Sequence, residues 1–98
     1  MVENKDDNVV FIGSKPFMNY VTSVAMQFTT KEQKEVTVKA RGKFISRAVD
    51  IAEVIRKKFL KDKNVDVAEI KIDSEELENR EGKKMNVSTI EIKLSKNS

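Results

Sequence analysis

The segment Glu35–Asp50, EVTVKARGKFISRAVD, contains the change of period that decides the fold. Its first half alternates, with Val36, Val38 and Ala40 on one side, as in a half-buried strand. After Gly42 the apolar residues recur at helical spacing instead. We therefore predict a strand that passes through a short basic turn directly into a helix.

The helix predicted after this turn is apolar on more than one side. One stripe follows the helical period and consists of Ile45, Ala48, Val49, Ala52, Ile55 and Phe59. Ile51 and Val54 lie off that stripe. Two interpretations are open: the helix is wedged deep in the fold, or it offers a second contact surface to a partner chain.

A similar strand-to-helix arrangement occurs once earlier in the chain. The apolar run NVVFIG (8–13) predicts a strand buried on both faces, and Pro16 suits the first turn of a following helix. The core-facing stripe of that helix is Phe17, Val21, Val24, Ala25 and Phe28.

Two more strands are predicted toward the other end of the chain, VDVAEIKI (65–72) and VSTIEIKL (87–94). The polar stretch between them has the turn signal EGK at its centre and favours a projecting, solvated hairpin. The fold class is therefore α/β, a single-domain two-layer sandwich in β-α-β-α-β-β order. It has a mixed sheet with two helices on one face and an extended β-hairpin arm.

The same patterns set the expected domain organisation. We predict a flexible N-terminal tail over residues 1–7 and a single domain over residues 8–96. The hairpin arm covers about residues 75–86.

The composition excludes several classes of protein. A chain of 98 residues that is 39% hydrophobic and 36% charged fits one globular domain. Without cysteine or histidine it lacks a disulfide framework, a thiolate metal site and the usual general base. It has no run of about 18 apolar residues, and its polar start predicts no signal peptide. We predict no enzyme, cofactor, metal site or membrane partner, and a place in a reducing cytoplasm.

Basic residues gather at the two predicted helix starts. The first start has Lys15, and the second has Arg41 and Lys43 on either side of Gly42. Cations are unfavourable for a helix start, whose exposed N–H groups attract anions. The two loops lie at one end of the sheet if their strands are parallel. These residues predict an anion site that could take DNA, RNA or a small phosphorylated ligand.

The run RKKFLKDK (56–63) has a different interpretation. It lies at the C-terminal end of the second predicted helix, where cations complement the helix dipole. We interpret it as a solvated surface. The formal net charge of +3 is too small to indicate a nucleic-acid binder by itself.

The segments NVVFIGSKPFMNYV (8–21), VKARGKFISRAVD (38–50) and VSTIEIKL resemble the Alba family of archaeal chromatin proteins in order and spacing. The resemblance runs from about Asn8 to Leu94. It implies a homodimer that binds double-stranded DNA, and often RNA, with weak sequence preference. It also implies a chromosome-associated protein that organises or compacts the nucleoid.

The resemblance implies roles for individual residues as well. The implied nucleic-acid contacts are Lys15, Arg41, Gly42, Lys43 and Arg47 in the body, and Arg80, Lys83 and Lys84 near the tip of the arm. Phe59 matches an aromatic position through which neighbouring dimers pack along DNA.

Two departures from the family pattern affect this expectation. Ser14 stands where the best-known loop of the family has a lysine. The arm is also acidic, because its carboxylates outnumber its cations. The carboxylates are Asp73, Glu75, Glu76, Glu78 and Glu81. Acids along the arm oppose the approach of phosphates, so we expect weaker and more salt-sensitive binding than in a fully basic member.

Two other functions stay open. One is an RNA-binding protein, acting as an RNA chaperone or as a ribonucleoprotein subunit. RNA readers usually present aromatic side chains, and this chain has one Tyr, no Trp and five Phe, mostly in core-type positions. That composition favours recognition of a duplex backbone. The other is a protein-interaction module that binds no nucleic acid.

Overall fold

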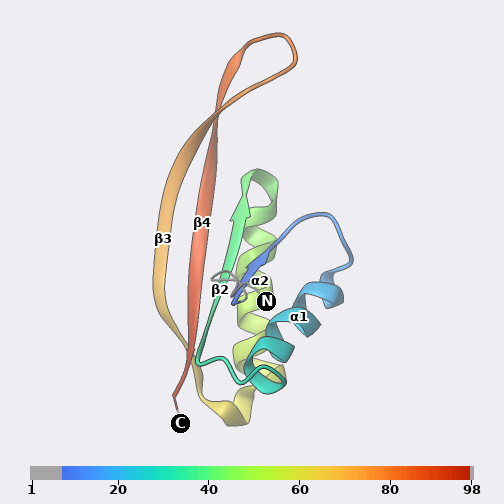
Figure 1. Cartoon of the computed structure of the whole chain (residues 1–98), viewed down its shortest axis with the longest axis vertical. Coiled ribbons are helices and arrows are strands. Elements are labelled where there is room, and N and C mark those ends of the chain that lie inside the picture. The colour runs from blue at the N-terminus through green and yellow to red at the C-terminus, as the bar shows by residue number, and fades with distance from the viewer. Residues whose placement is uncertain (1–7, 98) are drawn as a thin grey trace, which may run out of the picture.

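The structure is a computed structural model that describes residues 8–97 and has the predicted order of elements (Figure 1). The strands are β1 (Val9–Phe11), β2 (Glu35–Arg41), β3 (Val65–Glu78) and β4 (Lys84–Lys96). The helices are α1 (Phe17–Thr29) and α2 (Ile45–Val54). Short turns are the 3₁₀ turns η1 (Gly42–Phe44) and η3 (Lys61–Lys63) and the π-helical turn η2 (Ile55–Phe59). The tail predicted over residues 1–7 lies outside the described residues.

The four strands form one mixed sheet in the order β1-β2-β4-β3. β1 is parallel to β2, and the other two pairs are antiparallel. In β2 the alternate residues Val36, Val38 and Ala40 are buried, and both helices pack over that face (Figure 1). The predicted α/β fold class is thus confirmed. No helix within residues 8–97 is long and apolar enough to cross a membrane.

The prediction that the first strand is buried on both faces was wrong. β1 is a short edge strand, and only one face of the sheet is covered by helices. Val10 points into the core and is 9% exposed, whereas Phe11 points to the other face and is 66% exposed.

The buried side of α2 also differs from the predicted stripe. Ile51 is fully buried, whereas Val49 is 41% exposed. The helix then widens, because the Leu60 N–H donates to the Ile55 carbonyl at 2.8 Å, five residues back. This π turn adds one residue to the helical period. Leu60 therefore takes the core position that regular spacing gave to Phe59, and Phe59 is 45% exposed.

An irregularity in β3 sets which of its side chains face the helices. The register with β4 shifts between Val67 and Glu69, so Ala68 is an extra residue, as in a β-bulge. Beyond the bulge Ile70 lies opposite the buried Ile92 and therefore on the helix side of the sheet. Without the extra residue, the side chains of β3 beyond it would face the other way.

The β3–β4 hairpin projects beyond the helices as the predicted arm (Figure 1). Its tip is organised by Asn79, whose Oδ1 accepts the N–H groups of Glu81 and Lys83, each at 2.9 Å. Gly82 has a φ of +80°, a conformation that favours glycine. The Asn79 side chain thus fixes the turn through hydrogen bonds within the turn itself.

The buried position of Ile51 generates a prediction about stability. Ile51→Ala is expected to lower the free energy of unfolding by about 2–5 kcal/mol, because it leaves a cavity in a packed core. Its neighbour Asp50 is exposed, so Asp50→Ala should change stability by less than about 0.5 kcal/mol. Denaturant unfolding at a fixed protein concentration measures both. Equal effects of the two substitutions would contradict this orientation of α2.

Candidate functional site

The parallel pairing of β1 and β2 brings two basic loops to the same end of the sheet (Figure 1). The first basic loop, residues 12–16, carries Lys15, and the second, residues 41–44, carries Arg41 and Lys43. All three side chains are exposed. Within residues 8–97 neither Lys15 nor Lys43 forms an ion pair. The structure therefore places three of the predicted cations at the same end of the sheet, with their side chains exposed to solvent.

The side chain of Tyr20 holds the backbone of the first basic loop. The Tyr20 hydroxyl accepts the backbone N–H groups of Gly13 and Lys15, both at 3.0 Å. The Tyr20 side chain is buried, so these bonds fix the loop against the core. Sequence reasoning missed this role. Its signal was that a buried tyrosine hydroxyl usually has a hydrogen-bond partner.

Arg47 lies differently from the other cations of the body. Its Nη1 donates to the Gly13 carbonyl at 2.6 Å, and its guanidinium carbon lies 5.7 Å from the centroid of the Tyr20 ring. The side chain is half-buried and links α2 to the first basic loop. Arg47 thus positions the loop, while its contact with nucleic acid stays a prediction.

Gly42 allows the sharp turn of the second basic loop. It has a φ of +58°, in the left-handed region. A β-carbon there would meet Val87 Cγ1 at 3.5 Å, which is an ordinary contact. The backbone conformation, and not a lack of space, therefore favours glycine at this position. Beside it, Lys43 Nζ lies 5.4 Å from the centroid of the Phe44 ring.

Acidic side chains face the cations on the helix-free face of β2. Arg41 Nη1 lies 3.3 Å from Glu75 Oε1, and Lys39 Nζ lies 4.0 Å from Glu91 Oε2. Sequence reasoning counted the acids of the arm and did not identify Glu75 as the partner of Arg41. That pairing depends on the register of β3, which composition does not reveal.

The predicted cations of the arm lie apart from the basic loops. Arg80 and Lys83 are exposed in the turn and form no ion pair in the described part of the chain. Lys84 Nζ lies 3.7 Å from Glu76 Oε1. Figure 1 shows the tip projecting past the end of the sheet where the basic loops lie. A ligand that touches both groups must therefore be extended.

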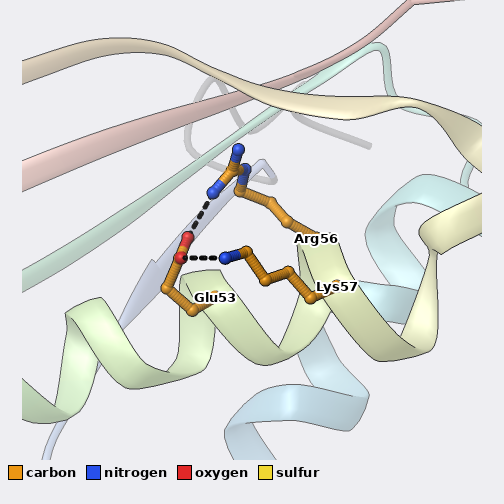
Figure 2. Close-up of polar contacts among 3 residues, drawn as sticks. All are labelled: Glu53, Arg56 and Lys57. Atoms are coloured by element: carbon orange, nitrogen blue, oxygen red, sulfur yellow. Dashed lines mark hydrogen bonds and ion pairs between the residues drawn. The ribbon is translucent and has the colours of Figure 1, made fainter.

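Two cations near the end of α2 are paired within the helix (Figure 2). Arg56 Nη1 donates to Glu53, and Lys57 Nζ lies 3.6 Å from the other carboxylate oxygen. The hydrogen bond from Arg56, with the positive charges beside it, holds the pKa of Glu53 below its usual range. Ionised Glu53 stabilises the fold through this pairing. The stabilisation is present above the ordinary pKa of a glutamate and is lost as the pH falls through the lowered pKa. Because the group is partly exposed, the effect is small.

Phe59 is the exposed aromatic residue at the far end of this helix. It is 45% exposed, and its neighbours Lys57 and Lys58 are exposed as well. It is therefore not a core residue of this chain. Its contact with a neighbouring dimer stays a prediction.

Comparisons with known proteins agree on one family. The Alba family profile matches residues 8–74. "DNA/RNA-binding protein Alba" of Methanocella arvoryzae is 54% identical over 91 residues, covering 93% of this chain and 92% of that protein. The protein of the same name from Nanoarchaeum equitans is 59% identical over 88 residues, covering 89% of this chain and 96% of its own.

Solved structures have the same fold. Alba from Thermoplasma volcanium superposes with a TM-score of 0.82 at 47% identity, covering 91% of this chain and all of that one (100%). ALBA1 from Trypanosoma brucei superposes with a TM-score of 0.68 at 27% identity, covering 97% of this chain and 74% of that one.

The Tyr20 hydroxyl provides a test of how the first basic loop is held. Tyr20→Phe should lower the free energy of unfolding by about 1–3 kcal/mol, because two loop N–H groups lose their acceptor. Amide hydrogen exchange at Gly13 and Lys15 should accelerate more than exchange in the sheet. Thr29→Val is the control, because it removes a hydroxyl that bonds to the Ala25 carbonyl at an exposed place. Unchanged exchange at both amides would show that Tyr20 does not hold the loop.

Proposed function

This chain belongs to the Alba family, and we propose that it binds double-stranded DNA as a homodimer, mainly through phosphates. In this role it organises or compacts chromosomal DNA in an archaeal cytoplasm, with weak sequence preference. The name "DNA/RNA-binding protein Alba", which the curated relatives carry, supports nucleic-acid binding. The exposed cations of the basic loops support a duplex ligand, and the exposed apolar residues of β3 support a dimer. The chromosomal role rests on the resemblance to the Alba family.

One observation carries the proposal: Lys15, Arg41 and Lys43 are exposed at two helix starts at one end of the sheet. Lys15 and Lys43 form no ion pair in the described residues, so their charges contribute little to the stability of the fold. A phosphate backbone supplies regularly spaced anions that neutralise such a surface and releases its counterions. Contacts of this kind position a protein on a duplex and carry no base information.

Exposed apolar residues of β3 support the homodimer. Ile70 and Ile72 are 58% and 76% exposed, although they lie opposite the buried Ile92 and Ile90. The apolar face of the sheet thus continues past the edge of the helices. Burying a side chain of this kind contributes about 1.5–3 kcal/mol. A second copy presents the same surface, as a two-fold interface requires.

RNA is the second candidate ligand, and Phe11 favours it. The expectation that the aromatic side chains lie mostly in the core does not hold for Phe11, which is 66% exposed. Lys39 Nζ lies 5.7 Å from the centroid of its ring. An exposed ring beside a cation can stack on an unpaired base. Titration with single-stranded RNA, beside DNA and RNA duplexes of the same sequence, separates the two candidates.

The principal test is Arg41→Ala. Removing a charge-assisted hydrogen bond to phosphate should weaken duplex binding about tenfold or more per subunit, by similar factors for all sequences. The slope of log affinity against log salt should become shallower by up to about 0.9 for each phosphate that the variant no longer neutralises. Fluorescence anisotropy with a short DNA duplex at several salt concentrations measures both quantities.

Lys57→Ala is the matched control for Arg41→Ala. It removes the same charge from an exposed position that is paired with Glu53, away from the basic loops. It should change the affinity much less than Arg41→Ala. Equal losses in the two variants, or no binding by the unchanged protein at low salt, would overturn the proposed DNA contact.

A separate prediction concerns Phe59, which we propose as the contact between dimers on DNA. Phe59→Ala should reduce cooperative binding to long DNA and leave binding to a short duplex unchanged, because the ring is exposed in one subunit. Met26 is exposed to a similar degree on α1, so Met26→Ala should leave cooperativity intact. Preserved cooperativity in Phe59→Ala, with a large loss of stability, would identify a structural residue instead.

A further inference from the structure

We propose that Glu75 competes with nucleic-acid phosphate for Arg41, so that the arm masks one cation of the basic loops in the free protein. This inference rests on the proposed function, because it assumes that Arg41 contacts phosphate. The inference predicts that Glu75 alone, through its pairing with Arg41, lowers the affinity for nucleic acid. The acidic composition of the arm does not identify which carboxylate has this effect.

The geometry of the pair is suited to exchange. Arg41 Nη1 and Glu75 Oε1 lie 3.3 Å apart, and the two side chains are 58% and 51% exposed. An ion pair this exposed is worth little, because water and salt screen it. An incoming phosphate can therefore displace the carboxylate without disrupting the core.

The sheet brings the two groups together on its helix-free face. Arg41 lies opposite Thr89 of β4, and Glu75 lies opposite Val87 of the same strand. The two strands that carry them flank β4, so their side chains meet across it. Both groups line a hollow of about 400 Å³ that Phe44 also borders. The carboxylate is thus built into the surface beside the cation.

Arg41 differs in this respect from the other two cations. Lys15 and Lys43 form no ion pair within residues 8–97, so a phosphate meets them unopposed. At Arg41 the phosphate must replace a carboxylate, and that carboxylate then recruits a cation from solution. The exchange reduces the net release of counterions and makes the salt dependence shallower. At this pair the effect is therefore opposite to the greater salt sensitivity expected from the acidity of the arm.

The test measures duplex DNA binding of Glu75→Gln by fluorescence anisotropy over a range of salt. The substitution keeps the size of the side chain and removes its charge. Affinity at low salt should rise about 2- to 5-fold per subunit, the range that an exposed ion pair represents. The slope of log affinity against log salt should steepen by up to about 0.9 per subunit.

Glu69→Gln is the matched control, because Glu69 lies on the same strand and face and pairs with Lys93 at 3.4 Å. It breaks a similar ion pair toward the other end of the strand, so it should raise affinity less than Glu75→Gln. The double variant Arg41→Ala/Glu75→Gln tests the coupling. Removing Glu75 should gain little once Arg41 is absent.

The outcomes separate the two proposals. If Arg41→Ala weakens binding but Glu75→Gln matches Glu69→Gln, the DNA contact stands and the competition is wrong. If Glu75→Gln lowers affinity, the carboxylate positions Arg41 for phosphate, and the competition is again wrong. An equal gain from Glu75→Gln with and without Arg41 also overturns it. If Arg41→Ala leaves affinity unchanged, the phosphate contact fails, and the inference fails with it.

Discussion

The parallel pairing of β1 with β2 is short, but it determines at which end of the sheet both basic loops lie. It spans only Val9–Phe11 on one strand and Thr37–Lys39 on the other. Parallel neighbours cannot be joined by a tight turn, so the chain must cross over the sheet through α1. The carboxyl ends of both strands then meet at the same edge. An antiparallel β1 would carry the first basic loop to the opposite end and separate Lys15 from Arg41.

Two clear changes of period made the fold predictable from sequence. The alternation of Val36, Val38 and Ala40 and the helical spacing after Gly42 indicate elements that the structure contains. The residue that enters the core after α2 was less accessible, because the π turn that places Leu60 there instead of Phe59 has no local signal in the apolar pattern. The exposure of Phe11 depends on which face the helices cover, and a single apolar run does not report that.

The cations of the candidate site could be predicted from the sequence of the two loops. The contacts that these loops make with other elements could not be predicted. Lys15, Arg41 and Lys43 stand out in sequence because cations at a helix start need a reason. The support from Tyr20 and the pairing with Glu75 arise between residues of different elements. Their positions follow from the register and the crossover, which become visible only when the chain is folded.

The extra residue at Ala68 makes the arm sensitive to length as well as to composition. Side chains alternate between faces along β3, so one residue added or removed between Ala68 and Glu75 would exchange the two faces of the arm. A deletion would bring Glu76 to the side of Arg41 and keep a carboxylate there. An insertion would bring Ser74 to the position opposite Val87, from which Glu75 pairs with Arg41, and leave no carboxylate at that position. A change of one residue in length can therefore alter the charge that the arm presents to a ligand, with no change in the rest of its sequence.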